Sequence, residues 1–247
     1  FLFEAGFIGA ALIVVWLILR NRPEDMGLEP LFTGRSEKLV VAAEPGRGAS
    51  RGVVIAMLAA TVLIGVMANP GFSHLTVLFK SEGFDNMTVA WVVSVVGVSL
   101  TLGKMVYGQI TDRLGAYRSG FVFFGLLVAG EILCCLTGQL NVVVAVIAMI
   151  CLGLGLPLAT VGLSVWAAEV SAPGEYGKTV RRFQMAYMIG ALVFGPVPGI
   201  IADATGSYIP VYVVMSLMAV AAMALVQISF RQARTATALT RTPSARI

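Results

Sequence analysis

The sequence predicts an all-α polytopic membrane protein: a six-helix bundle of two inverted three-helix repeats, preceded by one further transmembrane helix. Of the 247 residues, 58% are hydrophobic and 12% are charged, about half the charged share of an ordinary soluble domain. The apolar residues form long runs, and a helix needs about 20 such residues to cross a bilayer. A motif also recurs within the chain. This composition excludes a soluble globular enzyme and a nucleic-acid-binding domain.

Seven apolar runs define the expected elements. Isolated strands cannot cross lipid, because their backbone groups would stay unpaired, so we expect helices. The runs are 1–19, 53–79, 87–110, 119–138, 140–168, 183–202 and 208–230.

The runs divide the chain into four segments. Because the chain begins at Phe1 inside an apolar run, we expect a fragment whose residues 1–19 are the last transmembrane helix of a missing N-terminal half. Residues 20–52 contain prolines, glycines and mixed charges, which is typical of a solvated linker. Residues 53–230 are expected to be the six-helix C-terminal bundle, and residues 231–247 a cytoplasmic tail.

The basic residues predict the orientation. Of seventeen Lys and Arg, fifteen lie in the linker, the tail and the loops after the third and fifth runs. These segments share one face if each run crosses the membrane, and basic loops favour the cytoplasm. We therefore expect an integral protein of a bacterial inner membrane or plasma membrane, with a cytoplasmic C-terminus.

An inverted repeat is indicated by the spacing G-x-x-x-D-x-x-G. It occurs at Gly108, Asp112 and Gly115, and again at Gly199, Asp203 and Gly206. The first copy follows the second of the six runs of the bundle. The second copy follows the fifth of these runs, on the opposite face of the membrane.

Two prolines agree with this repeat. Pro70 and Pro157 lie in the first run of each triplet, at matching distances from the start of the predicted run. Proline permits a bend, and inversion places the two bends toward opposite faces. Inverted repeats with interrupted helices are typical of secondary transporters that work by alternating access.

Lys104 is the main candidate for contact with a substrate. Ionisable residues inside membrane helices are costly and tend to be functional. Gly97, Thr101, Lys104 and Gly108 share one helical face, which suggests a cavity or a protein contact. The alternative is a lysine that extends its side chain to the membrane surface.

Other polar residues in or near the runs could line the same path. His74 is the only histidine, and it is either a proton-coupling group, a role for which histidine is suited, or a hydrogen-bonded gate residue. We expect Asn69 and Tyr187 to line the cavity. For Glu131, a packed or protonated carboxyl is preferred over a coupling site.

The first copy of the motif is expected to act as a gate. Gly108 would let helices approach closely, Gly115 suits a tight turn, and Asp112 can pair with Arg113 or Arg118. The alternative is a solvated turn with orientation charges. Trp91 and Trp166 are expected to be interfacial anchors, and Arg181 and Arg182 to begin the fifth helix of the bundle.

No catalytic, phosphate-binding or metal-ligand motif is present in the sequence. We therefore expect no enzymatic activity, no cofactor and no metal.

At this point the chain resembles the C-terminal half of a major facilitator superfamily transporter with its sixth helix. GQITDRLGAYR (Gly108–Arg118) resembles the signature loop of that superfamily. RNRPEDMGLEP (Arg20–Pro30) and DATGSY (Asp203–Tyr208) resemble segments of the monocarboxylate-transporter-like and oxalate–formate-antiporter-like branch. In these relatives a cationic residue four before the signature glycine, usually Arg, binds the substrate carboxylate, and Lys104 has that position. Lysine is a point charge, so it lacks the two-bond recognition of arginine.

The resemblance implies a secondary transporter that moves a small organic anion, a monocarboxylate above all, by proton symport or anion exchange. Its expected partners are that anion, protons, the lipid bilayer and the missing N-terminal half, but no nucleic acid. The alternatives are an exporter of other small molecules on the same fold, and a truncated membrane protein that does not transport.

Overall fold

The computed structural model describes residues 2–18, 49–137, 141–172 and 174–240. It divides the chain into two units, Phe1–Pro45 and Gly46–Ile247. The stretch Arg20–Pro30 and most of the expected linker and tail lie outside the described residues. In the first unit, the described element is the apolar helix α1 (Leu2–Ile18), which exposes large side chains such as Phe7 and Trp16.

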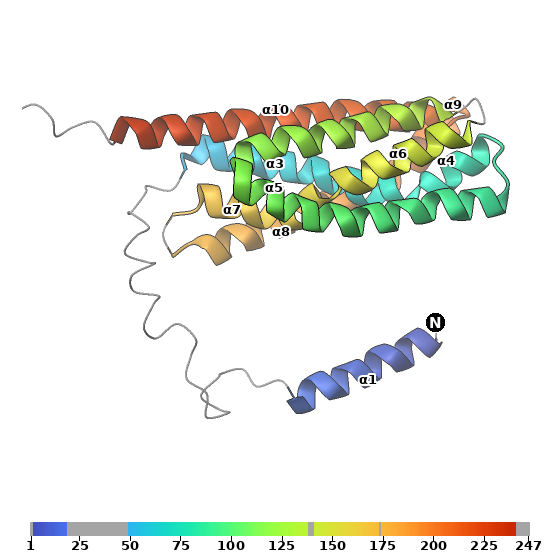
Figure 1. Ribbon diagram of the computed structural model, residues 1–247, viewed down its shortest axis with the longest axis horizontal. Helices are drawn as coiled ribbons and strands as arrows, with labels where there is room; N and C mark the ends of the chain where they lie inside the picture. Colours follow the sequence, from blue (N-terminus) through green and yellow to red (C-terminus); the bar gives the residue numbers. More distant parts are fainter. Residues whose placement is uncertain (1, 19–48, 138–140, 173, 241–247) are drawn as a thin grey trace, which may run out of the picture. The chain divides into compact units, whose positions relative to one another are not determined.

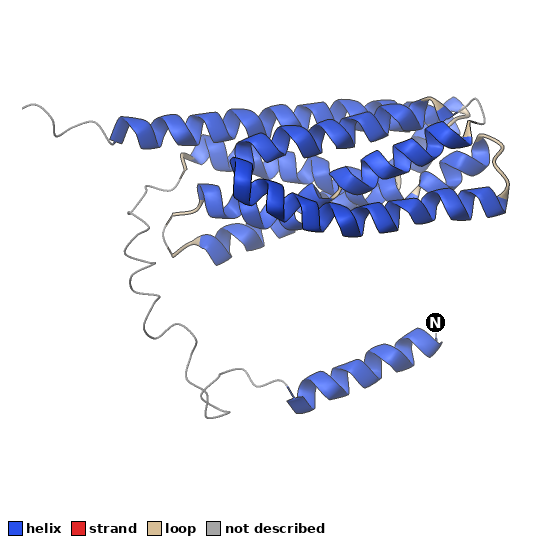
Figure 2. Cartoon of the chain, viewed as in Figure 1, coloured by secondary structure: helices blue, strands red, loops and turns tan. Residues whose placement is uncertain are grey.

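The second unit is helical, and the described residues contain no strand (Figure 2). Its elements are α3 (Arg51–Val66), η2 (Met67–Gly71), α4 (Leu75–Ser81), α5 (Asn86–Cys135), α6 (Val142–Gly155), η4 (Leu158–Gly162), α7 (Leu163–Val170), α8 (Tyr176–Val193), α9 (Val197–Thr205) and α10 (Ile209–Thr240). Here η2 and η4 are single wide turns of π-helix. The predicted all-helical fold class is confirmed.

Polar side chains fix where several of these helices begin. The carboxylate of Asp85 accepts hydrogen bonds from the backbone N–H groups of Met87 and Thr88 at the start of α5. Asn141 caps α6 in the same way, and Ser50 caps α3. Such caps satisfy N–H groups that have no partner within the helix.

The helix α5 contains two membrane crossings. At 50 residues a straight helix would be about 75 Å long, far more than the roughly 30 Å core of a bilayer. Gly115 breaks it with φ 78° and ψ 161°, a conformation that glycine adopts without strain. Figure 1 shows α5 doubling back at this point.

Contacts across the break show that the two halves of α5 are antiparallel. Thr111 donates a hydrogen bond to the hydroxyl of Ser119 over 3.1 Å. One step further from the break, the rings of Tyr107 and Phe123 meet edge to face with centroids 4.7 Å apart. The expected loop between the runs 87–110 and 119–138 is therefore wrong: both helices continue to a turn at Gly115.

Five helices are long and apolar enough to cross a membrane, as judged over the described residues. They are Arg51–Gly71, Asn86–Cys135, Val142–Val170, Tyr176–Thr205 and Ile209–Ala233. With α5 counted as two crossings, the bundle has the six predicted ones. The predicted run 183–202 needs correction. Its helix begins earlier, at Tyr176, is interrupted between Val193 and Val197, and ends at Thr205.

The two prolines lie at the π-helical turns. Pro70 is inside η2, and Pro157 immediately precedes η4. Proline has no N–H to donate to the preceding turn, so the helix widens there. The predicted bends are thus present, but Pro157 is four residues closer to the start of α6 than Pro70 is to the start of α3. That the two turns lie toward opposite faces of the membrane stays a prediction.

Glycines set the closest helix contacts. A Cβ atom on Gly65 of α3 would stand 2.1 Å from the backbone oxygen of Tyr187 in α8, and one on Gly190 of α8 would stand 2.1 Å from that of Val62. The first half of α5 and α6, the pair that the proposed repeat relates to α8 and α3, pack in the same way. A Cβ on Gly103 of α5 would lie 3.1 Å from the oxygen of Gly153 in α6.

The core lies between these helices and the outside is apolar. Trp166 is fully buried and stacks on Phe124 with ring centroids 5.9 Å apart, so its predicted role as an interfacial anchor is wrong. Trp91, in contrast, is 71% exposed near the start of α5. Many large apolar side chains of the bundle are exposed, among them Leu102, Leu192 and Leu217, as expected for a surface that faces lipid.

The contact at Gly65 gives a first prediction. We expect Gly65→Ala to destabilise the purified protein by about 1–3 kcal/mol, because α3 and α8 must move apart to admit the methyl group. Gly125→Ala is the control, since a Cβ there meets open space. Thermal unfolding in detergent measures both, and equal stability of the two variants would contradict the packing described.

Candidate functional site

The first half of α5 has three distinct faces. One is buried against the bundle, with side chains at helical spacing: Val92, Val96, Ser99, Gly103 and Tyr107. The second exposes large apolar side chains: Trp91, Val98, Leu102 and Met105. The third is exposed or half-buried and carries only small or polar residues and one lysine: Ser94, Gly97, Thr101, Lys104 and Gly108. We call this third face the polar strip of α5.

Lys104 is the one cation on the polar strip, and its side chain is exposed. No hydrogen bond or ion pair joins it to another described residue. Thr101, one turn away, donates its hydroxyl to the backbone oxygen of Gly97 over 3.0 Å. This bond occupies the hydroxyl hydrogen but leaves lone pairs on the oxygen. The strip thus offers a positive charge beside small residues that leave room for a bound group.

Asn69 and Tyr187 come together from distant parts of the sequence. The amide of Asn69 donates to the Tyr187 hydroxyl over 2.8 Å and contacts the backbone oxygen of Gly65 over 3.3 Å. Asn69 lies in the η2 turn, Tyr187 in α8, and both are half-buried. The phenolic hydrogen of Tyr187 stays available for a further acceptor. The α3–α8 glycine contact brings these two polar side chains within reach of each other.

His74 lies between η2 and α4 and is half-buried. Its Nδ1 is 2.8 Å from the backbone oxygen of Pro70, and a carbonyl can only accept, so Nδ1 carries hydrogen. The ring stacks on Tyr208 with centroids 5.9 Å apart. These contacts link the His74 ring to the proline turn, and both predicted roles of His74 stay predictions.

The predicted substrate residues form two separate groups. Asn69 and Tyr187 are bonded to each other, and His74 is linked to Pro70 in the same turn. No hydrogen bond between described residues joins Lys104 or Thr101 to this group.

The motif Gly108–Gly115 is positioned differently from the prediction in two respects. Asp112, Arg113 and Arg118 are all exposed, and in the described part of the bundle Asp112 pairs with neither arginine. A Cβ on Gly108 would meet open space, so the expected close helix approach at Gly108 is absent within the bundle. The tight turn at Gly115 is confirmed.

The second copy of the motif ends in a different turn. Gly206 has φ 74° and ψ 7°, the left-handed conformation of a helix C-cap, whereas Gly115 has φ 78° and ψ 161°. A cavity of about 330 Å³ is lined by Ala202, Asp203, Gly206 and Ser207 together with Ser81 and Tyr208. The inverted repeat stays a prediction.

A contact that the sequence did not indicate ties α10 to the α5 turn. Arg231 donates from Nε to the Tyr117 hydroxyl over 2.8 Å, and its guanidinium carbon lies 5.9 Å from the centre of that ring. Sequence analysis treated Arg231 only as an orientation charge. Its position just past an apolar run gives no sign of a partner more than a hundred residues away.

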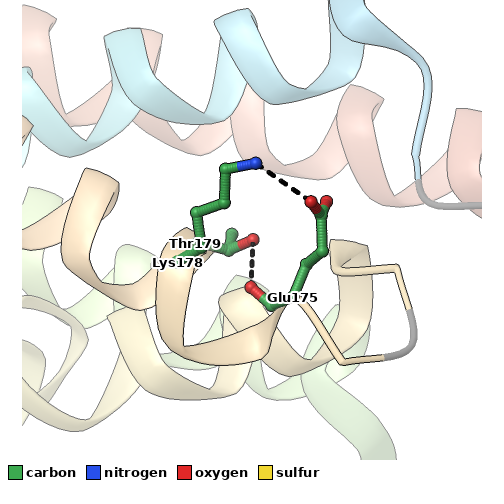
Figure 3. A network of polar contacts seen from close by, with 3 residues as sticks. All are labelled: Glu175, Lys178 and Thr179. Carbon is green, nitrogen blue, oxygen red and sulfur yellow. Dashed lines mark hydrogen bonds and ion pairs between the residues drawn. The ribbon is translucent and has the colours of Figure 1, made fainter.

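The start of α8 carries an exposed ion pair. Lys178 donates to Glu175 over 3.0 Å, and the hydroxyl of Thr179 donates to the Glu175 backbone oxygen (Figure 3). The hydrogen bond from Lys178 lowers the pKa of the Glu175 carboxyl below its usual value. Arg181 and Arg182 lie within α8 rather than at its start, and both are exposed.

Metal binding finds no support in the described part of the chain, where no three His, Cys, Asp or Glu side chains are arranged to hold an ion.

Comparison with known families agrees with the fold. The chain matches the Major Facilitator Superfamily over residues 1–180 and again over residues 82–244. No curated protein matches it significantly. The matched segments together span nearly the whole sequence, and the described bundle has helices that are long and apolar enough to cross a membrane. This chain is therefore a multi-pass membrane protein that belongs to the Major Facilitator Superfamily, a family of membrane transporters.

Proposed function

We propose that the chain is the C-terminal part of a secondary transporter for a small organic anion, with monocarboxylates as the first class to test. The observation that carries this proposal is Lys104, an exposed cation without a partner among the described residues, on a strip of small and polar side chains. A membrane protein keeps such a charge where a ligand or a partner neutralises it. A carboxylate is the simplest ligand that does so, through a charge-assisted hydrogen bond.

The proposed mechanism is alternating access. The bundle would face a second six-helix half, which the expected missing N-terminal segment supplies, and α1 would be the last helix of that half. Anion binding at Lys104 favours closure because it neutralises the charge. Coupling is by proton symport or by exchange of one anion for another, and His74 is the candidate group for a proton.

The gate residues have proposed roles in the same cycle. Pro70 and Pro157 lie at the wide turns of the two proposed repeats, where proline already interrupts the regular hydrogen bonds and the helix can bend. Asp112, Arg113 and Arg118 are exposed at the α5 turn, and we propose that they pair with the other half in one state.

An exporter of lipophilic or cationic compounds is the second candidate. It would need an acidic group on a cavity-lining face, and the polar strip of α5 has none. A membrane protein without transport activity is the third candidate. In neither the exporter nor the protein without transport activity would Lys104 bind an anionic substrate.

The first test is Lys104→Gln in the complete transporter, with uptake of radiolabelled lactate and oxalate into proteoliposomes. We expect uptake to fall about 10- to 100-fold at equal expression, because a hydrogen bond to a charged group contributes about 1.5–3 kcal/mol. Lys104→Arg should retain activity. The control is Lys80→Gln, which removes an exposed lysine near the end of α4. Normal uptake by Lys104→Gln would falsify the assignment.

The second test concerns Asn69 and Tyr187. Asn69→Ala and Tyr187→Phe should each reduce uptake about 2- to 10-fold, the effect of one hydrogen bond. The double variant should lose no more uptake than the more impaired of the two single variants, because both substitutions remove the same bond. Tyr176→Phe, at an exposed tyrosine of α8, is the control. Strictly additive losses would show that the two side chains act independently.

The third test concerns orientation. The proposed cytoplasmic C-terminus predicts that green fluorescent protein fused after Ile247 is fluorescent and that alkaline phosphatase fused there is inactive in a bacterial host. The reverse pattern would place the basic segments outside and contradict the charge distribution.

A further inference from the structure

Glu131 is a buried acid that the proposed transport mechanism does not use. It lies in the second half of α5 and is 2% exposed. Its Oε2 atom is buried and has no hydrogen-bond partner among the described residues. Cys135 contacts the backbone oxygen of Glu131, not its carboxyl group.

The Glu131 side chain borders a small apolar cavity. The cavity has a volume of about 10 Å³, room for at most one water molecule. Its other walls include Met67, Gly71, Leu152, Leu156 and Tyr212. Bulk water therefore does not surround the carboxyl group in this arrangement of the helices.

The cavity lies between the η2 turn and the end of α6. Met67 and Gly71 are the first and last residues of η2, and Leu156 follows the last residue of α6. Tyr212 of α10 donates its hydroxyl to the backbone oxygen of Gly71 over 2.9 Å. One carboxyl group thus lies beside the turn that contains Pro70.

The titratable groups around Glu131 give it no counter-ion. Those that interact with it electrostatically are Cys134 and Cys135 on its own helix and Tyr212 on α10. Cys151 on α6 lies near Cys134. His74, which lies between η2 and α4, is bonded to Pro70. An unpaired carboxylate in such surroundings is strongly disfavoured, and a neutral acid is not.

We propose that Glu131 is a proton-binding site that controls how tightly the η2 turn and the end of α6 pack together. With its proton, the neutral carboxyl stays in the closed cavity. When the O–H bond breaks, the proton passes to a water molecule that enters, and the carboxylate that remains must be hydrated. Hydration enlarges the cavity and loosens the turn around Pro70.

This switch is a property of the bundle and does not depend on the transported substrate. Its use in a transport cycle rests on the proposed function, where it would couple proton release to bending at Pro70. The experiments below therefore follow the proton and the turn directly, without a transport assay.

Infrared spectroscopy of the full chain in lipid vesicles tests the proton. We expect the wild type at neutral pH to show the C=O stretch of a neutral carboxylic acid. Glu131→Gln should lose this band, whereas Glu169→Gln, at an exposed carboxylate of α7, should keep it. A band that survives in Glu131→Gln overturns the proposal, as does its absence from the wild type.

Hydrogen exchange tests the turn. Peptides that cover Met67–His74 are compared between wild type and Glu131→Gln at each pH, so that the pH dependence of intrinsic exchange cancels. We expect equal exchange at acidic pH and several-fold faster exchange in the wild type at alkaline pH, because glutamine stays neutral. Glu169→Gln should follow the wild type.

A constant ratio of the exchange rates of wild type and Glu131→Gln across the pH range overturns the proposal, since exchange in the turn would then not depend on the protonation of Glu131. If Glu131→Gln does not yield folded protein, Glu131→Met provides a second neutral side chain of similar length for both measurements. A chain that shows the band and the pH-dependent turn but no anion uptake would refute the proposed function and leave the switch intact.

Discussion

The structure depends on how closely its helices approach one another in an apolar solvent. Lipid is as apolar as leucine, so burying large apolar side chains between membrane helices gains little, and packing of backbone against backbone has to hold the bundle together. At Gly65 and Gly190, and again at Gly103 and Gly153, one helix lies against the backbone of its neighbour, without room for a side chain. Large apolar residues remain on the outside, where they meet lipid.

These close contacts also position the polar groups. Because α3 and α8 touch at their glycines, Asn69 and Tyr187 reach one another, although 118 positions separate them in the chain. Because α5 packs on α6 through one face, its small and polar strip is left outside the bundle core. The only lysine of that strip then has no partner within the described bundle, and this is the observation behind the proposed anion site.

The proline turns add a second constraint. Proline has no N–H to donate to the preceding turn, so the hydrogen bonding around η2 is irregular. The oxygen of Gly71 accepts from the Tyr212 hydroxyl, and that of Pro70 is bonded by both the backbone N–H and the ring of His74. Side chains therefore add to the backbone bonds of this turn. The cavity that borders η2 also borders Glu131, which is why we propose that the proton of this acid affects the turn.

The sequence by itself determined the class of protein, the six crossings of the bundle and the interruptions at Pro70 and Pro157, because the length of an apolar run and the position of a proline are local properties. It also identified Lys104, Asn69, Tyr187 and His74 as polar residues in unusual places. It misplaced Trp166, and it missed the partner of Arg231 and the cavity at Glu131. Only the tertiary structure decided these points, because which residues face each other across a bundle depends on helix rotation and crossing, and uniformly apolar runs do not encode rotation.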